Sequence, residues 1–224
     1  MKLTNILETE YQDITEKKSL DVKQDSSDTV LMQAWKEWIL KENFIDSIFV
    51  INNNSAYKSA RDILKKRRYT QADITDSCFT INPSEERYGE YAFGTFISAS
   101  IAEHYERAKQ EQFGVDNYKI IIPPFFEKMY CIGFSNRDAK IEIFGNAGEH
   151  LGFCMKSGTI IVNGNVGDNT GWGMDRGKIT IHGNAGEETG YYMCEGIIEI
   201  MGNTGRYSGF KRRGGTIIVK GRRR

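Results

Sequence analysis

The chain has 224 residues, of which 39% are hydrophobic and 27% charged, and its 30 basic residues balance its 30 acidic residues. This balance gives no reason to expect binding to nucleic acid or to an anionic membrane. The sequence has no 18-residue apolar run, and its start lacks the apolar core of a signal peptide. We therefore expect a soluble, cytoplasmic protein.

The composition changes near residues 130 to 140. Nineteen of the 23 glycines follow Lys140, whereas all three prolines precede Cys131. We expect an N-terminal α/β capping region over residues 1–130 and a mainly β domain over residues 131–224. Residues 1–27 are polar and rich in Asp, Glu, Ser and Lys, which favours a flexible segment.

The N-terminal region begins with a predicted helix and a predicted strand. Apolar periodicity indicates a helix that starts at a cap on Ser27 or Asp28 and runs through Ile39. The apolar run over residues 48–51 then predicts a short buried strand.

Two further helices are predicted before the glycine-rich part. The second helix starts at a cap on Ser55 and ends at Leu64, where the basic residues 65–68 complement the helix dipole. The third helix covers residues 92–112 and carries one apolar face. A strand over residues 118–122 then leads into the glycine-rich part.

The glycine-rich part repeats every 19 residues without a slip. A fixed period of this length indicates one structural unit stacked on copies of itself. The unit is too short and too rich in glycine for a pair of helices, so it predicts one coil of a parallel β-helix. The columns that we expect to shape the coil are Gly145, Gly164, Gly183 and Gly202; Gly148, Gly167, Gly186 and Gly205; and Gly152, Gly171, Gly190 and Gly209.

Each unit opens with a short strand. Two columns of β-branched residues stand two positions apart, as the alternation of a half-buried strand requires. We expect both columns to form the core. They contain Ile141, Ile160, Ile179, Ile198 and Ile217, and Ile143, Val162, Ile181, Ile200 and Val219.

Three more columns complete the coil. Stacked asparagine amides can hydrogen-bond between coils about 4.8 Å apart, and asparagine tolerates the left-handed backbone of a sharp corner. An aromatic column and a methionine column suit a second inward face. These columns are Asn146, Asn165, Asn184 and Asn203; Phe153, Trp172, Tyr191 and Phe210; and Met155, Met174 and Met193.

One corner of the coil carries acidic side chains. Glu149, Asp168 and Glu187 stack there, with His150 beside them. Adjacent coils could bring two carboxylates together as an acid pair of the retaining type or as oxygen ligands of a metal. The same pattern is typical of a solvated corner that resists aggregation. We prefer the second interpretation and predict no catalytic residue, no cofactor and no metal.

The end of the chain is basic. Eight basic residues and no acidic ones follow from Arg206 onward. This charge could protect the open edge of the last coil, contact an acidic partner or bind nucleic acid. The overall neutrality of the chain argues against the last. The predicted partner-binding residues are Arg206, Lys211, Arg212, Arg213, Lys220 and Arg222.

The repeat resembles the GXGXG-repeat domain, the right-handed β-helix at the end of the glutamate synthase large subunit. It is also similar to the β-helical subunit of formylmethanofuran dehydrogenase. The resemblance covers residues 141–221 through Gly-Asn-Ala-Gly-x-x-x-Gly followed by Met-x-x-Gly-x-Ile-x-Ile/Val-x-Gly. Residues 91–105 are similar to the helix that precedes the β-helix in glutamate synthase, which favours that relative.

The resemblance implies a non-catalytic scaffold subunit of a glutamate synthase-like, glutamine-dependent oxidoreductase complex. Its partners would be amidotransferase and FMN-binding synthase-like proteins. The chain differs from the whole enzyme because no cysteine follows Met1 and no cysteine cluster could hold an iron–sulfur centre. A small enzyme that uses the acidic corner and a structural protein that self-associates through its exposed coils are the alternatives.

Overall fold

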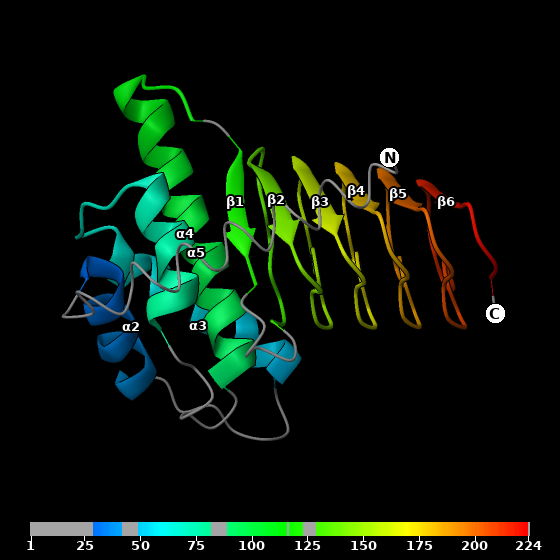
Figure 1. The fold of residues 1–224 in the computed structure, drawn as a ribbon, viewed down its shortest axis with the longest axis horizontal. Coiled ribbons are helices and arrows are strands. Elements are labelled where there is room, and N and C mark those ends of the chain that lie inside the picture. The colour runs from blue at the N-terminus through cyan, green and yellow to red at the C-terminus, as the bar shows by residue number, and fades with distance from the viewer. Residues whose placement is uncertain (1–28, 42–48, 82–88, 116, 123–128, 224) are drawn as a thin grey trace, which may run out of the picture.

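The computed structural model describes residues 29–41, 49–81, 89–115, 117–122 and 129–223. Helices gather at one end of an elongated molecule, and six strands follow one another along its length (Figure 1). The C-terminal coil lies at the end far from the helices. The predicted flexible segment over residues 1–27 lies outside the described residues.

The helices are α2 (Val30–Lys41), α3 (Phe49–Leu64), α4 (Gln71–Thr80) and α5 (Gly89–Glu111). The first and third predicted helices are confirmed as α2 and α5. The predicted caps Ser27 and Asp28 lie outside the described residues, and the Thr29 hydroxyl accepts from the Met32 amide at 3.1 Å.

Two predictions about α3 are wrong. Residues 49–51 of the predicted strand form the first turn of α3, and Ser55 lies within this helix rather than at its cap. A short apolar run looks alike in a strand and in a buried helix, so its periodicity could not separate them. The end of α3 agrees with the prediction, because the Arg67 guanidinium donates to the Ile63 carbonyl at 2.8 Å.

The sheet confirms a parallel β-helix with a helical cap. Its strands are paired in chain order and are all parallel. From β2 to β6 each residue pairs with the residue 19 positions later, so the sequence period is the register. The strands are β1 (Tyr118–Ile121), β2 (Lys140–Phe144), β3 (Thr159–Asn163), β4 (Lys178–Ile181), β5 (Ile197–Ile200) and β6 (Thr216–Val219).

The asparagine column forms a hydrogen-bonded ladder, as predicted. The Asn146 side-chain oxygen accepts from the Asn165 backbone amide at 2.8 Å, and the same contact recurs from Asn165 to Asn184 and from Asn184 to Asn203. These asparagines do not have the left-handed backbone that we predicted for them. That conformation occurs instead at the column of Cys131, His150, Asn169, Glu188 and Tyr207, where φ lies between 54° and 61°.

The glycine column that contains Gly152 explains the shape of the coil. Gly152 has φ +63°, and a Cβ atom there would lie 2.7 Å from Cδ1 of Ile179 in the next coil. The isoleucine tips fill the inner volume, so the aromatic column does not form the inward face that we predicted. Its rings follow one another along the stack with centroids 5.3 to 5.8 Å apart, from Phe153, 8% exposed, to Phe210, 50% exposed.

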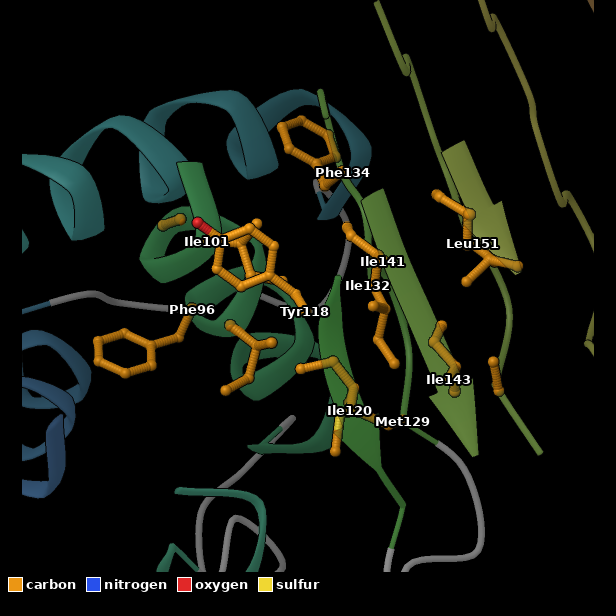
Figure 2. Packing of buried hydrophobic residues seen from close by; sticks show 14 of the residues in the cluster. Phe96, Ile101, Tyr118, Ile120, Met129, Ile132, Phe134, Ile141, Ile143 and Leu151 are labelled. Atoms are coloured by element: carbon orange, nitrogen blue, oxygen red, sulfur yellow. The ribbon is translucent and has the colours of Figure 1, made fainter. Parts of the chain in front are cut away.

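The helices close the first end of the stack. Side chains of α5 and β1 pack against those of the first coils in one continuous core, as Figure 2 shows for Phe96, Tyr118, Ile132 and Ile141. The Ser98 hydroxyl of α5 accepts the Gly133 amide at 2.9 Å. In later coils the equivalent amide donates to a carbonyl of the preceding coil. No coil precedes that of Gly133 in the described part of the chain, and the Ser98 hydroxyl takes the place of that carbonyl as the acceptor.

Candidate functional site

The acidic corner is held mainly by backbone contacts. One carboxylate oxygen of Asp168 accepts from the Glu187 amide at 2.7 Å, so this side chain links two coils. The Glu149 carboxylate lies under α5, where the Tyr91 hydroxyl is 3.4 Å away. Among the described residues, no group of three or more His, Cys, Asp or Glu side chains is arranged to hold a metal ion.

His150 belongs to the aromatic surface beside this corner. Its ring stacks on Trp172 with the centroids 6.2 Å apart and meets the Phe153 ring edge-on at 5.6 Å. Burial lowers the pKa of His150, while Asp168 opposes this shift. His150 is therefore a neutral ring packed among other rings at neutral pH.

The open end of the stack is capped by arginine side chains. In inner coils the carbonyl equivalent to Gly215 accepts an amide of the next coil, as Gly196 does from Thr216. At the end, the Arg212 guanidinium donates to the Gly215 carbonyl at 3.2 Å. The Arg223 guanidinium donates to the Ile217 carbonyl of β6 at 2.7 Å. These contacts provide the edge protection that the basic tail suggested.

An aromatic cluster lies beside this capped end. The Lys211 ammonium is 5.5 to 5.7 Å from the centroids of Tyr191, Tyr192 and Phe210, and Tyr207 packs against Phe210 at 5.9 Å. Tyr192, Tyr207 and Phe210 are 37%, 57% and 50% exposed. We call these five residues the terminal aromatic cluster. Exposed aromatic rings are enriched at protein interfaces.

All six predicted basic residues are exposed, and one of them, Lys211, belongs to this cluster. Arg212 caps the stack, whereas the side chains of Arg206, Arg213, Lys220 and Arg222 form no hydrogen bond or ion pair with the described residues. The sequence interpretation overlooked Tyr207 and Phe210 within the basic segment, and it did not join them to Tyr191 and Tyr192 because those belong to the preceding coil. The 19-residue period could have shown that Tyr192 and Lys211 share a column.

No protein-family model matches the chain, and a search of curated proteins finds no match. None of the described helices has both the length and the apolar composition needed to cross a membrane. The proposals that follow therefore depend on the geometry and on the sequence resemblance.

Proposed function

We propose that the protein is a non-catalytic scaffold that binds an acidic face of a partner protein through its last coil. The observation that carries the proposal is the terminal aromatic cluster, which places exposed rings and the Lys211 ammonium on a stack fixed by the asparagine ladder. The arginine caps cover two carbonyls of the edge, Gly215 and Ile217, so we expect side chains rather than backbone groups to form the contact surface.

The resemblance supplies the identity of the proposed partner. Amidotransferase and FMN-binding synthase-like proteins of a glutamate synthase-like, glutamine-dependent oxidoreductase would bind this end in the cytoplasm and act in glutamate metabolism. A formylmethanofuran dehydrogenase complex is the alternative assembly that follows from the second resemblance. In both assemblies this chain would hold the catalytic proteins in place without reacting itself.

Co-expression with the two proposed partner proteins tests this function. We expect the full chain to elute with at least one of them in size-exclusion chromatography with mass measurement. The double substitution Lys211→Glu and Arg213→Glu should abolish the complex, since it places like charge against an acidic face. The matched control Lys65→Glu and Lys66→Glu changes the same charge on exposed residues after α3 and should leave the complex intact.

The contrary outcomes are specific. Recovery of the chain alone from every co-expression would reject the glutamate synthase-like assembly. If the control variant lost the complex to the same extent as Lys211→Glu and Arg213→Glu, binding would depend on the net charge of the chain and not on its last coil. Binding of duplex or single-stranded nucleic acid with a steep salt dependence would replace a protein partner by a polyanion.

A further inference from the structure

The helical cap contains a hollow that the scaffold function does not use. It has a volume of about 350 Å³ and lies between the segment that joins α3 to α4, the start of α4, and the last turns of α5 with the residues that follow them. Its lining includes Arg68, Tyr69, His104, Arg107 and Phe113. This volume is at the lower end of the range for small-molecule sites, which is about 300 to 1,000 Å³.

His104 is a buried polar group at this hollow. Its residue surface is 5% exposed, and the rings of Tyr69, Phe113 and Tyr118 surround the imidazole with centroids 5.7 to 6.1 Å away. Nδ1 lies 2.8 Å from the Tyr118 hydroxyl, which β1 directs toward α5 (Figure 2). Nε2 forms no hydrogen bond with the described residues and is not sealed from solvent.

The contact with Tyr118 fixes the tautomer of His104. Burial raises the pKa of the Tyr118 hydroxyl, which therefore keeps its proton, and burial followed by Arg107 lowers the pKa of His104, which is therefore neutral. If Nδ1 carried the proton, the buried Tyr118 hydroxyl hydrogen would have no acceptor, at a cost of about 1 to 3 kcal/mol. The hydroxyl thus donates to Nδ1, and Nε2 carries the proton that can be donated to a ligand.

Two guanidinium groups line the same hollow. Arg107 lies over the Tyr69 ring at 5.2 Å and donates to the Arg67 carbonyl at 2.7 Å, so its position is fixed. Arg68 forms an exposed ion pair with Glu111, which belongs to the same lining. The hollow therefore combines one neutral donor, two cationic donors and one anion with two aromatic walls.

We infer that this hollow is a binding site for a small oxyanion, a carboxylate or a phosphate, held by His104 Nε2–H, Arg107 and Arg68. The walls Tyr69 and Phe113 would contact an apolar part of the ligand. The inference is independent of the terminal aromatic cluster, because the hollow lies in the helical cap at the other end of the stack (Figure 1).

Titration of the full chain with inorganic phosphate and with benzoate tests the inference. The imidazole nitrogen and carbon-bound proton resonances of His104 serve as the local readout, and His104→Gln identifies them among the three histidines. We expect saturable shifts at His104 with at least one anion, while His182 stays unchanged. Benzoate binding without phosphate binding would identify a carboxylate site, and the reverse would identify a phosphate site.

Three variants separate specific binding from general attraction. Arg68→Gln should weaken the anion about fivefold or more, since a charge-assisted hydrogen bond is lost. Lys65→Gln is the matched control, because Lys65 is also exposed and paired with an acid, yet does not line the hollow. Glu111→Gln should strengthen binding, because it removes the competing carboxylate.

Several results would overturn the inference. One is the absence of any His104 shift with either anion at tens of millimolar. Another is equal affinity in the wild type and Arg68→Gln, which would place the anion elsewhere. Tyr118→Phe offers a test of the tautomer, since His104 should then populate the Nδ1–H form and bind the anion more weakly. An unchanged imidazole nitrogen spectrum in Tyr118→Phe would reject the assigned proton position.

Discussion

The first coil lies under the helices, whereas the last coil faces solvent. At the first coil, the Gly133 amide would be unpaired without α5, and the buried Ser98 hydroxyl accepts it. At the last coil, the Gly215 and Ile217 carbonyls receive arginine side chains from the same coil and the tail. Side chains bind backbone groups at both edges, but only the first edge is covered by a hydrophobic core.

This difference separates stability from recognition. An edge inside a core must pair every backbone group, because a buried unpaired group costs about 1 to 3 kcal/mol. An edge in solvent can be satisfied by water, so its side chains are free to serve another purpose. The exposed rings of Tyr207 and Phe210 are therefore tolerated at the last coil and would be buried by helices at the first.

The same glycine column should respond differently at the two ends. Gly152→Ala forces a left-handed alanine and pushes the buried Ile179 tip, so we expect a loss of about 2 to 5 kcal/mol in unfolding free energy. At Gly209 the nearest atom to the added Cβ is Cδ1 of Ile217, 3.3 Å away, and Ile217 belongs to β6, the last strand of the sheet. Gly209→Ala should cost about 1 to 2 kcal/mol, chiefly from the backbone.

Chemical denaturation followed by circular dichroism measures both variants. Equal losses at Gly152 and Gly209 would show that packing onto the next coil contributes nothing beyond the backbone strain. A smaller loss of unfolding free energy in Gly152→Ala than in Gly209→Ala would contradict the packing of Gly152 against the next coil.

The repeat predicted the β-helix because a fixed register needs only local information. A period of 19 pairs each strand residue with the residue at the same position of the next coil. The β-branched columns of Ile141 and Ile143 then fall on the inward face. The asparagine ladder follows from the same argument, since identical amides at the strand spacing must meet.

Other features depend on tertiary contacts that the period does not contain. The helix α4 was missed although Thr70 and Asp73 form a capping box at its start. The left-handed column tolerates His150, Glu188 and Tyr207, so residue type did not reveal it. The hollow at His104 is lined by residues 68–71 and by residues of α5 and the segment after it, and no spacing along the chain indicates that juxtaposition.

The second largest loss of stability is expected from substitution of Ser98 at the covered edge. Ser98→Ala leaves the Gly133 amide unpaired inside the core, so we expect a loss of about 1 to 3 kcal/mol in unfolding free energy. Ser100→Ala is the matched control on α5, because the Ser100 hydroxyl is also buried but bonds only to the Phe96 carbonyl of its own helix. If Ser100→Ala lowered the unfolding free energy as much as Ser98→Ala, the hydrogen bond from the Gly133 amide would contribute nothing specific to stability.

Acid should destabilise the covered part of the molecule through its histidines. Burial lowers the pKa values of His104 and His150 below the ordinary value of 6.5, with Arg107 adding to the effect at His104 and Asp73 opposing it. The unfolded chain then binds protons that the folded chain does not, so stability is full above about pH 6.5 and falls as the pH decreases below it.

The melting temperature at pH 7.5 and pH 5.5 measures this effect. His150→Asn should reduce the pH dependence, and it suits the left-handed position because the next coil has Asn169 there. His182→Asn is the matched control, because it changes an exposed histidine outside the buried core. An unchanged slope in His150→Asn would contradict the neutral, packed ring.

The arginine caps of the open edge should change stability least. Arg212→Gln with Arg223→Gln removes two hydrogen bonds to carbonyls that water can reach, so we expect a loss of about 0.5 kcal/mol or less for each substitution. The larger consequence should be association, because the edge of β6 then presents free carbonyls to another chain.

Size-exclusion chromatography with light scattering over a concentration series should show dimers or larger species that the wild type does not form. Arg206→Gln with Arg222→Gln removes the same charge without touching the capped carbonyls, so association in this control as well would assign the protection to repulsion rather than to capping.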